Sequence, residues 1–289
     1  MVIVQLSGGL GNQMFEYSLY LSLKNRGKEV KIDDVTCYAD AGTRPKQLDV
    51  FGITYERASR EEMVEMTDAS MKMSDRIRRK LTGRKTKAYR EKDINYDSRV
   101  MELDPALLEG CFQSEKYFAD CREQVREAFR FRGIEDGRFA MPESVKAILE
   151  QIRAAQSVSV HIRRGDYLDP SHGGIYSGIC TEEYYRKAFE LIEEKYPDAV
   201  YFIFSNDAEW TKQNFSGKNR VIVEGTTEDT GYLDMYLMSH CKHNIIANSS
   251  FSWWGAWLND NPQKTVIAPS RWLNGQECID IYTEDMVRI

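Results

Sequence analysis

The sequence predicts an α/β protein built on parallel sheets, and three observations lead to this fold class. Predicted strands and helices alternate strictly through the C-terminal half of the chain. The N-terminal half opens in the same way, with a strand, a glycine loop, a helix and a second strand. With 289 residues the chain is long enough for two ordinary domains. We therefore expect one domain over residues 1–150 and another over residues 151–289.

The start of the N-terminal half is the more readable part of it. An apolar strand is expected over 2–6, a helix from about 12 to 26, and a second strand over 30–33. Gly27 supports the end of the helix, although part of this segment also alternates with period two. Between residues 37 and 137 the pattern is weak, and we predict no elements there.

The C-terminal half is expected to repeat a unit of one strand and one helix. Thr181 can cap a helix whose apolar residues recur at the spacing i, i+3, i+4 and i+7, and Pro197 stops this helix. The apolar run over 200–204 has the length of a strand that is covered on both faces. The other expected elements are strands over 157–162, 220–223, 245–247 and 265–268, and helices over 207–215, over 229–241 and from residue 252.

Composition and charge limit the classes of function. The chain has 42% hydrophobic and 29% charged residues, and its formal net charge of −6 argues against nucleic acid as a partner. Six cysteines occur without a Cys-x-x-Cys pair, which favours reduced thiols in a cytoplasm. The chain enters its first strand without a charged leader, and no apolar run approaches the ~18 residues of a membrane-spanning helix. We therefore expect a cytoplasmic protein.

One segment departs from this acidic average. Residues 72–92 contain ten Lys or Arg and two acidic residues. Such a run of charge is typical of a solvated helix or loop. The other interpretation is a patch that faces an anionic membrane surface or acceptor. Peripheral contact with the inner face of a membrane, through Lys72 to Lys92, is therefore one expectation.

Two arginines directly follow the strand expected over 157–162. Arg163 and Arg164 would lie at the carboxyl end of the sheet, where open α/β sheets bind ligands, and guanidinium groups match phosphate oxygens. Neighbouring side chains point to opposite faces of a strand, so we assign Arg163 to phosphate and Arg164 to support or a shared contact. Asp166 can instead neutralise Arg164. His161 either contacts the ligand or is a hydrogen-bonded core residue.

A glycine-rich loop follows the first strand. Its glycines allow the backbone to approach a ligand closely and open the N-terminus of a helix, and Asp33 ends the next strand as a ribose-binding acid would. A dinucleotide-binding motif counted from Gly9 fails, however, because its third glycine position is Met14. A purely structural loop is another interpretation. The candidate ligand-binding residues of this loop are Gly9, Gly11, Asn12 and Gln13.

Polar residues follow two further strands. Asn206 and Asp207 come after the strand over 200–204, and a carboxylate there can accept two hydrogen bonds from a guanine edge. Either residue can instead cap the following helix, and the two roles can be divided between them. The run Asn248, Ser249, Ser250 and Phe251 lies between a strand and a helix. Its backbone N–H groups and the helix dipole suit a pyrophosphate.

The remaining aromatic and metal-binding candidates are weaker. Three tryptophans at 253, 254 and 257 are more typical of a core than of a sugar platform. His240, Cys241 and His243 fall short of a zinc site. The chain contains no Asp-x-Asp, the carboxylate pair with which many enzymes hold a nucleotide sugar through Mg²⁺ or Mn²⁺. We predict no metal site, and arginine and helix N-termini would replace the cation.

Four of these motifs, taken together and in order, resemble the bacterial α-1,2-fucosyltransferases of glycosyltransferase family 11. They are residues 8–13 (GGLGNQ), 161–167 (HIRRGDY), 204–207 (FSND) and 248–258 (NSSFSWWGAWL). The resemblance implies a GT-B architecture of two Rossmann-like domains that face each other across a cleft. It also implies that the C-terminal domain binds GDP-fucose and the N-terminal domain binds the acceptor. The implied reaction is metal-independent, inverting transfer of fucose to the 2-hydroxyl of a terminal galactose.

The same resemblance assigns roles to individual residues. It places Arg163 on the β-phosphate, Asp207 on guanine, and Asn12 near the fucose or the attacking hydroxyl. Residues 249–251 would take the pyrophosphate. The proton acceptor stays open between Asp166 and Glu16, and a late proton transfer can make a strong base unnecessary. Three alternatives remain: a transferase with another GDP-deoxysugar or linkage, an NAD-linked oxidoreductase, and a non-catalytic phosphoglycan-binding protein.

Overall fold

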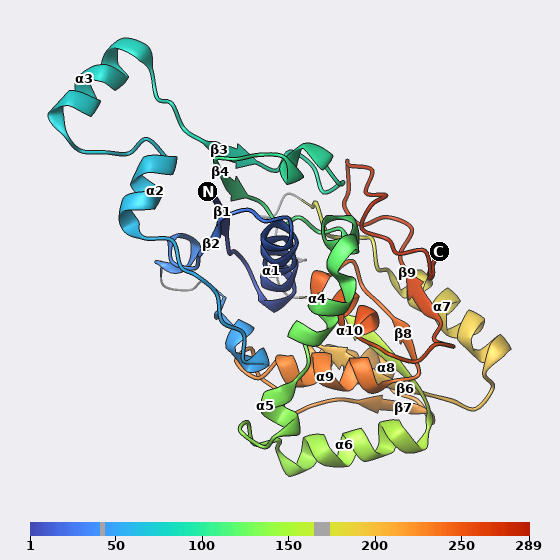
Figure 1. Cartoon of the computed structure of the whole chain (residues 1–289). Coiled ribbons are helices and arrows are strands. Elements are labelled where there is room, and N and C mark those ends of the chain that lie inside the picture. Colours follow the sequence, from blue (N-terminus) through green and yellow to red (C-terminus); the bar gives the residue numbers. More distant parts are fainter. Residues whose placement is uncertain (41–43, 165–173) are drawn as a thin grey trace. The chain divides into compact units, whose positions relative to one another are not determined.

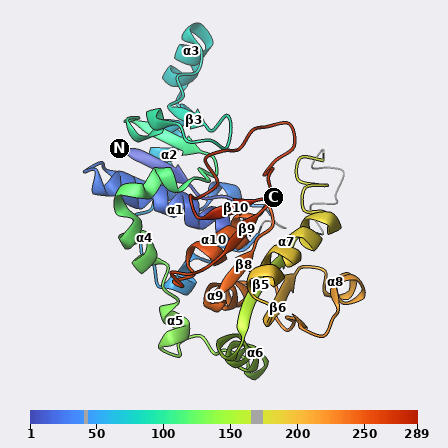
Figure 2. The same ribbon diagram turned by 90° about the vertical axis from the view of Figure 1, so that its right-hand side faces the viewer.

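The computed structural model describes residues 1–40, 44–164 and 174–289. The chain divides into two compact units, residues 1–130 and 131–289. Each unit contains a sheet of parallel strands with helices beside it (Figures 1 and 2). The α/β prediction is therefore confirmed. The boundary expected after residue 150 differs, because α6 (Glu143–Ala154) buries its apolar face and packs on α9 of the second unit.

The sheet of the first unit has the strand order β2-β1-β4-β3, with all strands parallel. The strands are β1 (Val2–Gln5), β2 (Val30–Asp33), β3 (Ala88–Arg90) and β4 (Ala106–Glu109). The side chains of residues 2–4 in β1 are fully buried, as expected for a central apolar strand. The predicted strands over 2–6 and 30–33 are confirmed. The other two lie in the segment for which we predicted no elements.

Helix α1 (Leu10–Asn25) follows the glycine loop and contacts β1 and β2. It begins slightly before the expected Asn12, with Gly9 as its N-cap, and Gly27 follows it with a φ of +78°. Most of its residues are buried, which explains why its sequence showed no clean apolar stripe. The remaining helices of this unit are α2 (Arg60–Met66), α3 (Met73–Thr82) and α4 (Arg122–Ala128), with 3₁₀ turns over Thr36–Tyr38, Leu48–Phe51, Ser98–Met101 and Glu115–Cys121.

The second unit contains a parallel sheet in the order β10-β9-β8-β5-β6-β7. Its strands are β5 (Gln156–Ile162), β6 (Ala199–Ser205), β7 (Arg220–Ile222), β8 (His243–Ile245), β9 (Val266–Ala268) and β10 (Met286–Arg288). Counted from β5, this is the order 3-2-1-4-5-6 of dinucleotide-binding folds. The chain changes direction across the sheet between β5 and β8. Open α/β sheets bind their ligands at such a switch point.

Four of the helices described in this unit match predicted ones, and the first two lie where we predicted none. They are α5 (Arg132–Glu135), α6, α7 (Glu182–Lys195), α8 (Ala208–Phe215), α9 (Tyr232–His240) and α10 (Ser250–Trp257). Thr181 caps α7 by accepting the N–H of Tyr184 at 3.3 Å, and the predicted apolar stripe of α7 packs in the core. The three tryptophans of α10 are buried, as expected of core residues.

The six cysteines, all of which lie within the described residues, form no disulfides. Within the three described ranges of the chain, no helix combines the length and the apolar character that a membrane span requires.

Candidate functional site

The switch point of the second unit brings together the second and fourth sequence motifs. Arg163 and Arg164 follow β5, and residues 248–250 follow β8, which pairs with β5. The ring of His161 at the end of β5 lies 5.7 Å from that of Phe251 in the first turn of α10. Both loops therefore meet where the topology predicts a ligand.

Arg164 is held firmly by three neighbours. Its guanidinium carbon lies 3.6 Å from the centroid of the Trp210 ring, and its Nε donates to Oδ2 of Asp207 at 3.3 Å. Its backbone N–H donates to Oδ1 of Asn206 at 2.9 Å. These contacts fit a supporting role, which is one of the two roles that we expected of Arg164. Its ionic partner among the described residues is Asp207, whereas the suggested partner Asp166 lies outside them.

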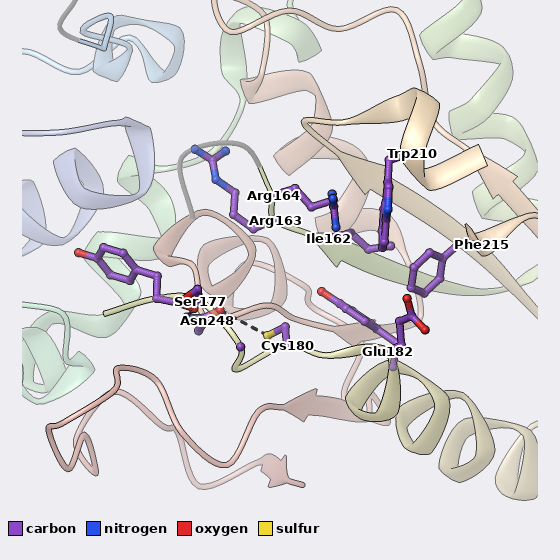
Figure 3. A pocket seen from close by; sticks show the side chains of 12 residues that line it. Ile162, Arg163, Arg164, Ser177, Cys180, Glu182, Trp210, Phe215 and Asn248 are labelled. Carbon is purple, nitrogen blue, oxygen red and sulfur yellow. Dashed lines mark hydrogen bonds between the residues drawn. The ribbon is translucent and has the colours of Figure 1, made fainter. Parts of the chain in front are cut away.

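Arg163 extends in another direction. Figure 3 shows its side chain pointing away from Trp210, against which Arg164 lies. This alternation is the one predicted for neighbours at a strand end. Both arginines line a pocket of about 80 Å³, together with Glu182, Tyr185, Trp210 and Asn248 among others. Ligand pockets typically measure roughly 300–1,000 Å³, so this one can hold only part of a nucleotide.

Asp207 uses both carboxylate oxygens within the protein. Oδ1 accepts the N–H of Trp210 at 3.1 Å and caps α8, and Oδ2 accepts from Arg164. The capping interpretation of the sequence is therefore confirmed. A guanine base bound by Asp207 would have to share these oxygens with protein donors. Asn206 is likewise engaged with the backbone of Arg164, although its side chain is exposed.

Asp234 is a candidate that sequence reasoning missed. It lies in the first turn of α9, which follows β7 and so begins at the carboxyl edge of the sheet. Its Oδ2 accepts from the Thr226 hydroxyl at 3.0 Å, whereas its buried Oδ1 has no hydrogen-bond partner among the residues that the structure describes. Burial raises the pKa of Asp234 to about 7. Unpaired buried carboxyls of this kind cluster at functional sites.

The side chain of Asn248 holds loops together. It is 2% exposed, and its Nδ2 donates to the carbonyl oxygens of Tyr176 and Trp272 at 3.2 and 3.1 Å. Its Oδ1 accepts from the thiol of Cys180 at 3.4 Å. We expected Asn248 to bind substrate, but these contacts give its amide a structural part. Asn248 reaches the pocket only as part of its wall.

The turn before α10 keeps the features of an anion site. Ser249 is the N-cap residue but makes no side-chain cap, and Ser252 instead accepts the N–H of Ala247 at 3.2 Å. Ser250 and Phe251 form the start of the helix and are half-buried. The first N–H groups of a helix have no acceptor within it, and the helix dipole favours negative charge there. This arrangement can bind a phosphate group.

The residues considered for zinc have other contacts. His240 bonds the carbonyl oxygen of Tyr236 at 2.8 Å through Nδ1, and Nδ1 of His243 accepts the N–H of Thr265 at 3.0 Å. Burial lowers the pKa of His243 to about 4, so the ring is neutral at neutral pH. In the parts of the chain that the structure describes, no three His, Cys, Asp or Glu side chains are grouped to hold a metal ion.

The first unit has a switch point of its own, between β1 and β4. Gly8 after β1 has a φ of +65°, and an added Cβ would lie 2.8 Å from Nδ2 of Asn12, so this position requires glycine. Asn12 reaches across to the loop after β4. Its Oδ1 accepts from Gln113 at 2.8 Å, and its Nδ2 contacts the sulfur of Cys111 at 3.2 Å.

The contacts of Gln13 differ from the ligand-binding role that we predicted for it. Its side chain is fully buried and its Nε2 donates to the carbonyl oxygens of Gly8 and Pro45 at 3.0 and 2.9 Å. Its Oε1 accepts the N–H of Gln47 at 2.9 Å. The amide therefore fixes the glycine loop to the neighbouring segment instead of facing a ligand. Gly9 and Gly11 belong to the same framework, as the N-cap and first turn of α1.

Asp33 does not have the surroundings of a ribose-binding acid. Its carboxylate accepts the N–H groups of Val35 and Thr36, both at 3.1 Å, and an amide hydrogen of Gln5 at 3.1 Å. It is 4% exposed. These contacts cap the turn after β2, and the dinucleotide interpretation gains no support from them.

Glu16 lies fully buried beneath the glycine loop. Its two oxygens accept the hydroxyl and the N–H of Ser7 at 2.6 and 2.8 Å. Burial raises the pKa of Glu16 well above its ordinary value, although the bonds from Ser7 oppose this shift. A second carboxyl with a raised pKa, Glu91, accepts the N–H of Cys111 at 2.7 Å. This switch point is thus lined by carboxyl and amide groups, whereas the other is cationic.

Two successive parallel α/β units, with an arginine-lined switch point in the second, are typical of proteins that bind a nucleotide-like ligand. The family model described as Glycosyl transferase family 11 matches residues 86–288. The chain belongs to this family, and the resemblance noted in the sequence is confirmed.

Individual relatives agree with the family. The chain is 33% identical to an α-1,2-colitosyltransferase of Escherichia coli, over 100% of this chain and 98% of that protein. It is 31% identical to the O-antigen biosynthesis glycosyltransferase WbnK of Escherichia coli, over 93% of this chain and 94% of that protein. It is 28% identical to galactoside α-(1,2)-fucosyltransferase 1 of Saimiri boliviensis boliviensis, over 54% of this chain and 43% of that protein. The crystal structure of NodZ α-1,6-fucosyltransferase soaked with GDP-fucose overlaps 89% of this chain and 91% of its own, with a TM-score of 0.45 and 17% identity.

Proposed function

We propose that the protein transfers fucose from GDP-fucose to the 2-hydroxyl of a terminal galactose on a glycan, with inversion and without a metal ion. The observation that carries this proposal is the pair of arginines at the switch point of the second unit, in a member of glycosyltransferase family 11. The absence of Asp-x-Asp from the sequence supports the metal-independent part. Six cysteines without a disulfide support a reducing cytoplasm as its location.

The leaving group is stabilised by the two loops of this switch point. Cleavage of the anomeric C–O bond puts negative charge on GDP, and that charge is larger in the transition state than in the bound donor. We assign Arg163 to the β-phosphate and the first N–H groups of α10 to the pyrophosphate. Arg164 acts indirectly, because its contacts with Trp210 and Asp207 fix the loop that carries Arg163.

Guanine recognition is assigned to Asp234 before Asp207. An ionised carboxylate can accept hydrogen bonds from the ring N–H and the exocyclic amine of guanine. The Oδ1 atom of Asp234 accepts no hydrogen bond from the described residues, whereas each carboxylate oxygen of Asp207 accepts one. A donor base bound at Asp234 would relieve the cost of its burial.

Acceptor binding is assigned to the switch point of the first unit. Asn12 carries amide groups there that can bond sugar hydroxyls, and Glu16 with Ser7 offers a hydrogen-bonded route for the proton of the attacking hydroxyl. The hydroxyl proton would move to Oγ of Ser7 while the Ser7 proton moves to Oε1 of Glu16. Asp166 remains the other candidate proton acceptor, and it lies outside the described residues.

Colitose is the second candidate for the transferred sugar, because a colitosyltransferase matches the chain along its whole length. Recognition of the guanine base does not distinguish the two donors, because both are GDP-sugars. We would therefore incubate the protein with GDP-fucose or GDP-colitose, a panel of galactosides and EDTA. The proposal predicts GDP release and an α-1,2-linked fucosyl product with EDTA present. Turnover of GDP-colitose alone would favour the second candidate, loss of turnover in EDTA would contradict metal independence, and binding without turnover would indicate a glycan-binding protein.

A further inference from the structure

Helix α3 exposes a stripe of apolar side chains. In both views it stands away from the sheet of its unit, in the connection between α2 and β3 (Figures 1 and 2). Met73, Ile77 and Leu81 recur at a spacing of four residues on one face, and they are 67%, 54% and 79% exposed. Met71, just before the helix, is 79% exposed. No residue of α3 is buried.

Side chains on the flank of α3 and on its opposite face are fixed to its own unit. The guanidinium of Arg78 pairs with the carboxylate of Asp68, and Nη1 of Arg79 donates to the carbonyl oxygen of Asp68 at 3.1 Å. Asp75 accepts from the hydroxyl of Ser70 at 2.5 Å. The backbone N–H of Lys85, after the helix, donates to Asp68 at 2.8 Å. These bonds orient the helix, so the apolar stripe faces away from the anchored side.

Cations border the apolar stripe. Arg76 and Lys80, three and seven residues after Met73, are exposed beside the stripe, and Arg84 and Lys85 are exposed just after the helix. Residues 72–92 contain ten basic and two acidic residues in a chain of net charge −6. A short helix with an apolar face and a basic flank is the type that lies in the interface of an anionic bilayer.

We propose that α3 is a peripheral membrane anchor, which lies in the headgroup layer of an anionic bilayer with its apolar stripe turned toward the acyl chains. A second copy of this chain is a poor occupant, because two such basic helices would repel each other. A soluble polyanion would pair with the cations but leave four large apolar side chains in water. This inference does not depend on which sugar the enzyme transfers.

Sedimentation of the full-length protein with lipid vesicles tests the anchor. We expect binding to vesicles of phosphatidylcholine with phosphatidylglycerol, little binding to phosphatidylcholine alone, and weaker binding as salt is added. The double variant Ile77→Ser with Leu81→Ser should bind at least about tenfold more weakly. The double variant Arg76→Gln with Lys80→Gln should lose about fivefold for each cation removed.

Matched variants in the second unit serve as controls. Ile279→Ser with Leu191→Ser replaces the same residue types at positions that are 54% and 41% exposed, and Lys146→Gln with Arg153→Gln removes two exposed cations of α6. Both controls should bind vesicles like the unmodified protein. Transfer to a soluble galactoside should be unchanged in all four variants, which separates this test from that of the proposed function.

Three results would overturn the anchor. The first is failure of the unmodified protein to bind the anionic vesicles. The second is full binding by the Ile77→Ser, Leu81→Ser variant, which would indicate attraction of charge alone. The third is a dimer of the unmodified protein that this variant loses in sedimentation equilibrium, which would make a second copy the occupant.

Discussion

Replacement of Asp234 by Asn should make the protein more stable and less able to bind its nucleotide. Burial raises the pKa of this carboxyl from 3.8 to about 7. This rise of the pKa corresponds to ~4 kcal/mol of free energy, since a tenfold change in proton affinity is worth ~1.36 kcal/mol. The folded chain keeps the proton up to about pH 7, whereas the unfolded chain releases it near its ordinary pKa. Folding therefore takes up a proton in this window, and the free energy of unfolding falls as the pH rises through it.

The Asp234→Asn variant removes this loss because an amide does not ionise. Its side chain has the same shape and can still accept from Thr226. We expect the free energy of unfolding of the variant to exceed that of the unmodified protein by up to ~4 kcal/mol above about pH 7. Near pH 4 the difference should be less than ~1 kcal/mol. Urea unfolding followed by tryptophan fluorescence measures this, since all five tryptophans lie in the second unit. Asp198→Asn, at an exposed position, is the control.

Nucleotide binding gives the second half of this test. Inosine diphosphate lacks the exocyclic amine of guanine, so a carboxylate that reads guanine should prefer GDP. Loss of a charge-assisted hydrogen bond costs about 1.5–3 kcal/mol, and Asp234→Asn should weaken GDP binding at least about tenfold and abolish the preference over inosine diphosphate. Titration calorimetry with both nucleotides measures this. If the preference survives in Asp234→Asn and disappears in Asp207→Asn, the assignment of the base to Asp234 is wrong.

Three further variants test the remaining assignments. Arg163→Ala should lower kcat about 10² to 10³-fold, which is ~3–4 kcal/mol of activation free energy, and Arg163→Lys should recover part of this loss. Undiminished initial rates of Arg163→Ala with GDP-fucose would show that Arg163 does not have this role. Gln13→Leu should lower the free energy of unfolding by ~3 kcal/mol, because two carbonyl oxygens and one N–H lose their partner; a loss of kcat at unchanged stability in urea would mean that Gln13 faces a ligand after all. Glu16→Gln should remove a rise of kcat with pH that the raised pKa of Glu16 produces in the unmodified protein, and an unchanged pH profile would exclude Glu16 as the proton acceptor.

The predictable part of the fold is the part whose burial pattern is uniform. Strands β5 and β6 are buried on both faces, and β6 reads as a continuous apolar run, whereas β5 alternates apolar residues with serine and histidine. Helix α7 has both a side-chain cap and a one-sided stripe. Between residue 37 and its end at residue 130, the first unit carries weaker signals: α2 has a capping box but only seven residues, and the apolar stripe of α3 lies within a run of basic residues. Its β3 is three residues long, ends in an exposed arginine and lies at the edge of the sheet. Nothing in its local sequence separates it from the basic segment that contains it.

The candidate site shows the same limit at the level of single side chains. Arg163, Arg164 and Asp207 could be located because they follow strand ends, whose position relative to the sheet is set by topology. An amide beside a glycine or serine loop has no such marker: Gln13 and Asn248 look the same in sequence whether they face a ligand or the backbone. Asp234 was hidden for another reason, since an acidic residue in the first turn of a helix is common and usually favourable.

The two switch points differ in chemistry, and this difference follows the demands of glycosyl transfer. The second unit offers guanidinium and helix N–H groups, which in the proposed reaction would stabilise negative charge as it develops on a leaving diphosphate. The first unit offers Glu16 and Glu91, whose raised pKa values bring them closer to the neutral range in which a carboxylate can take a proton from a hydroxyl. An oxidoreductase that oxidises a hydroxyl also needs a proton acceptor, but it releases no diphosphate whose growing negative charge would need cations. The cations of the second unit therefore favour group transfer over hydride transfer, independently of the motifs that identify the family.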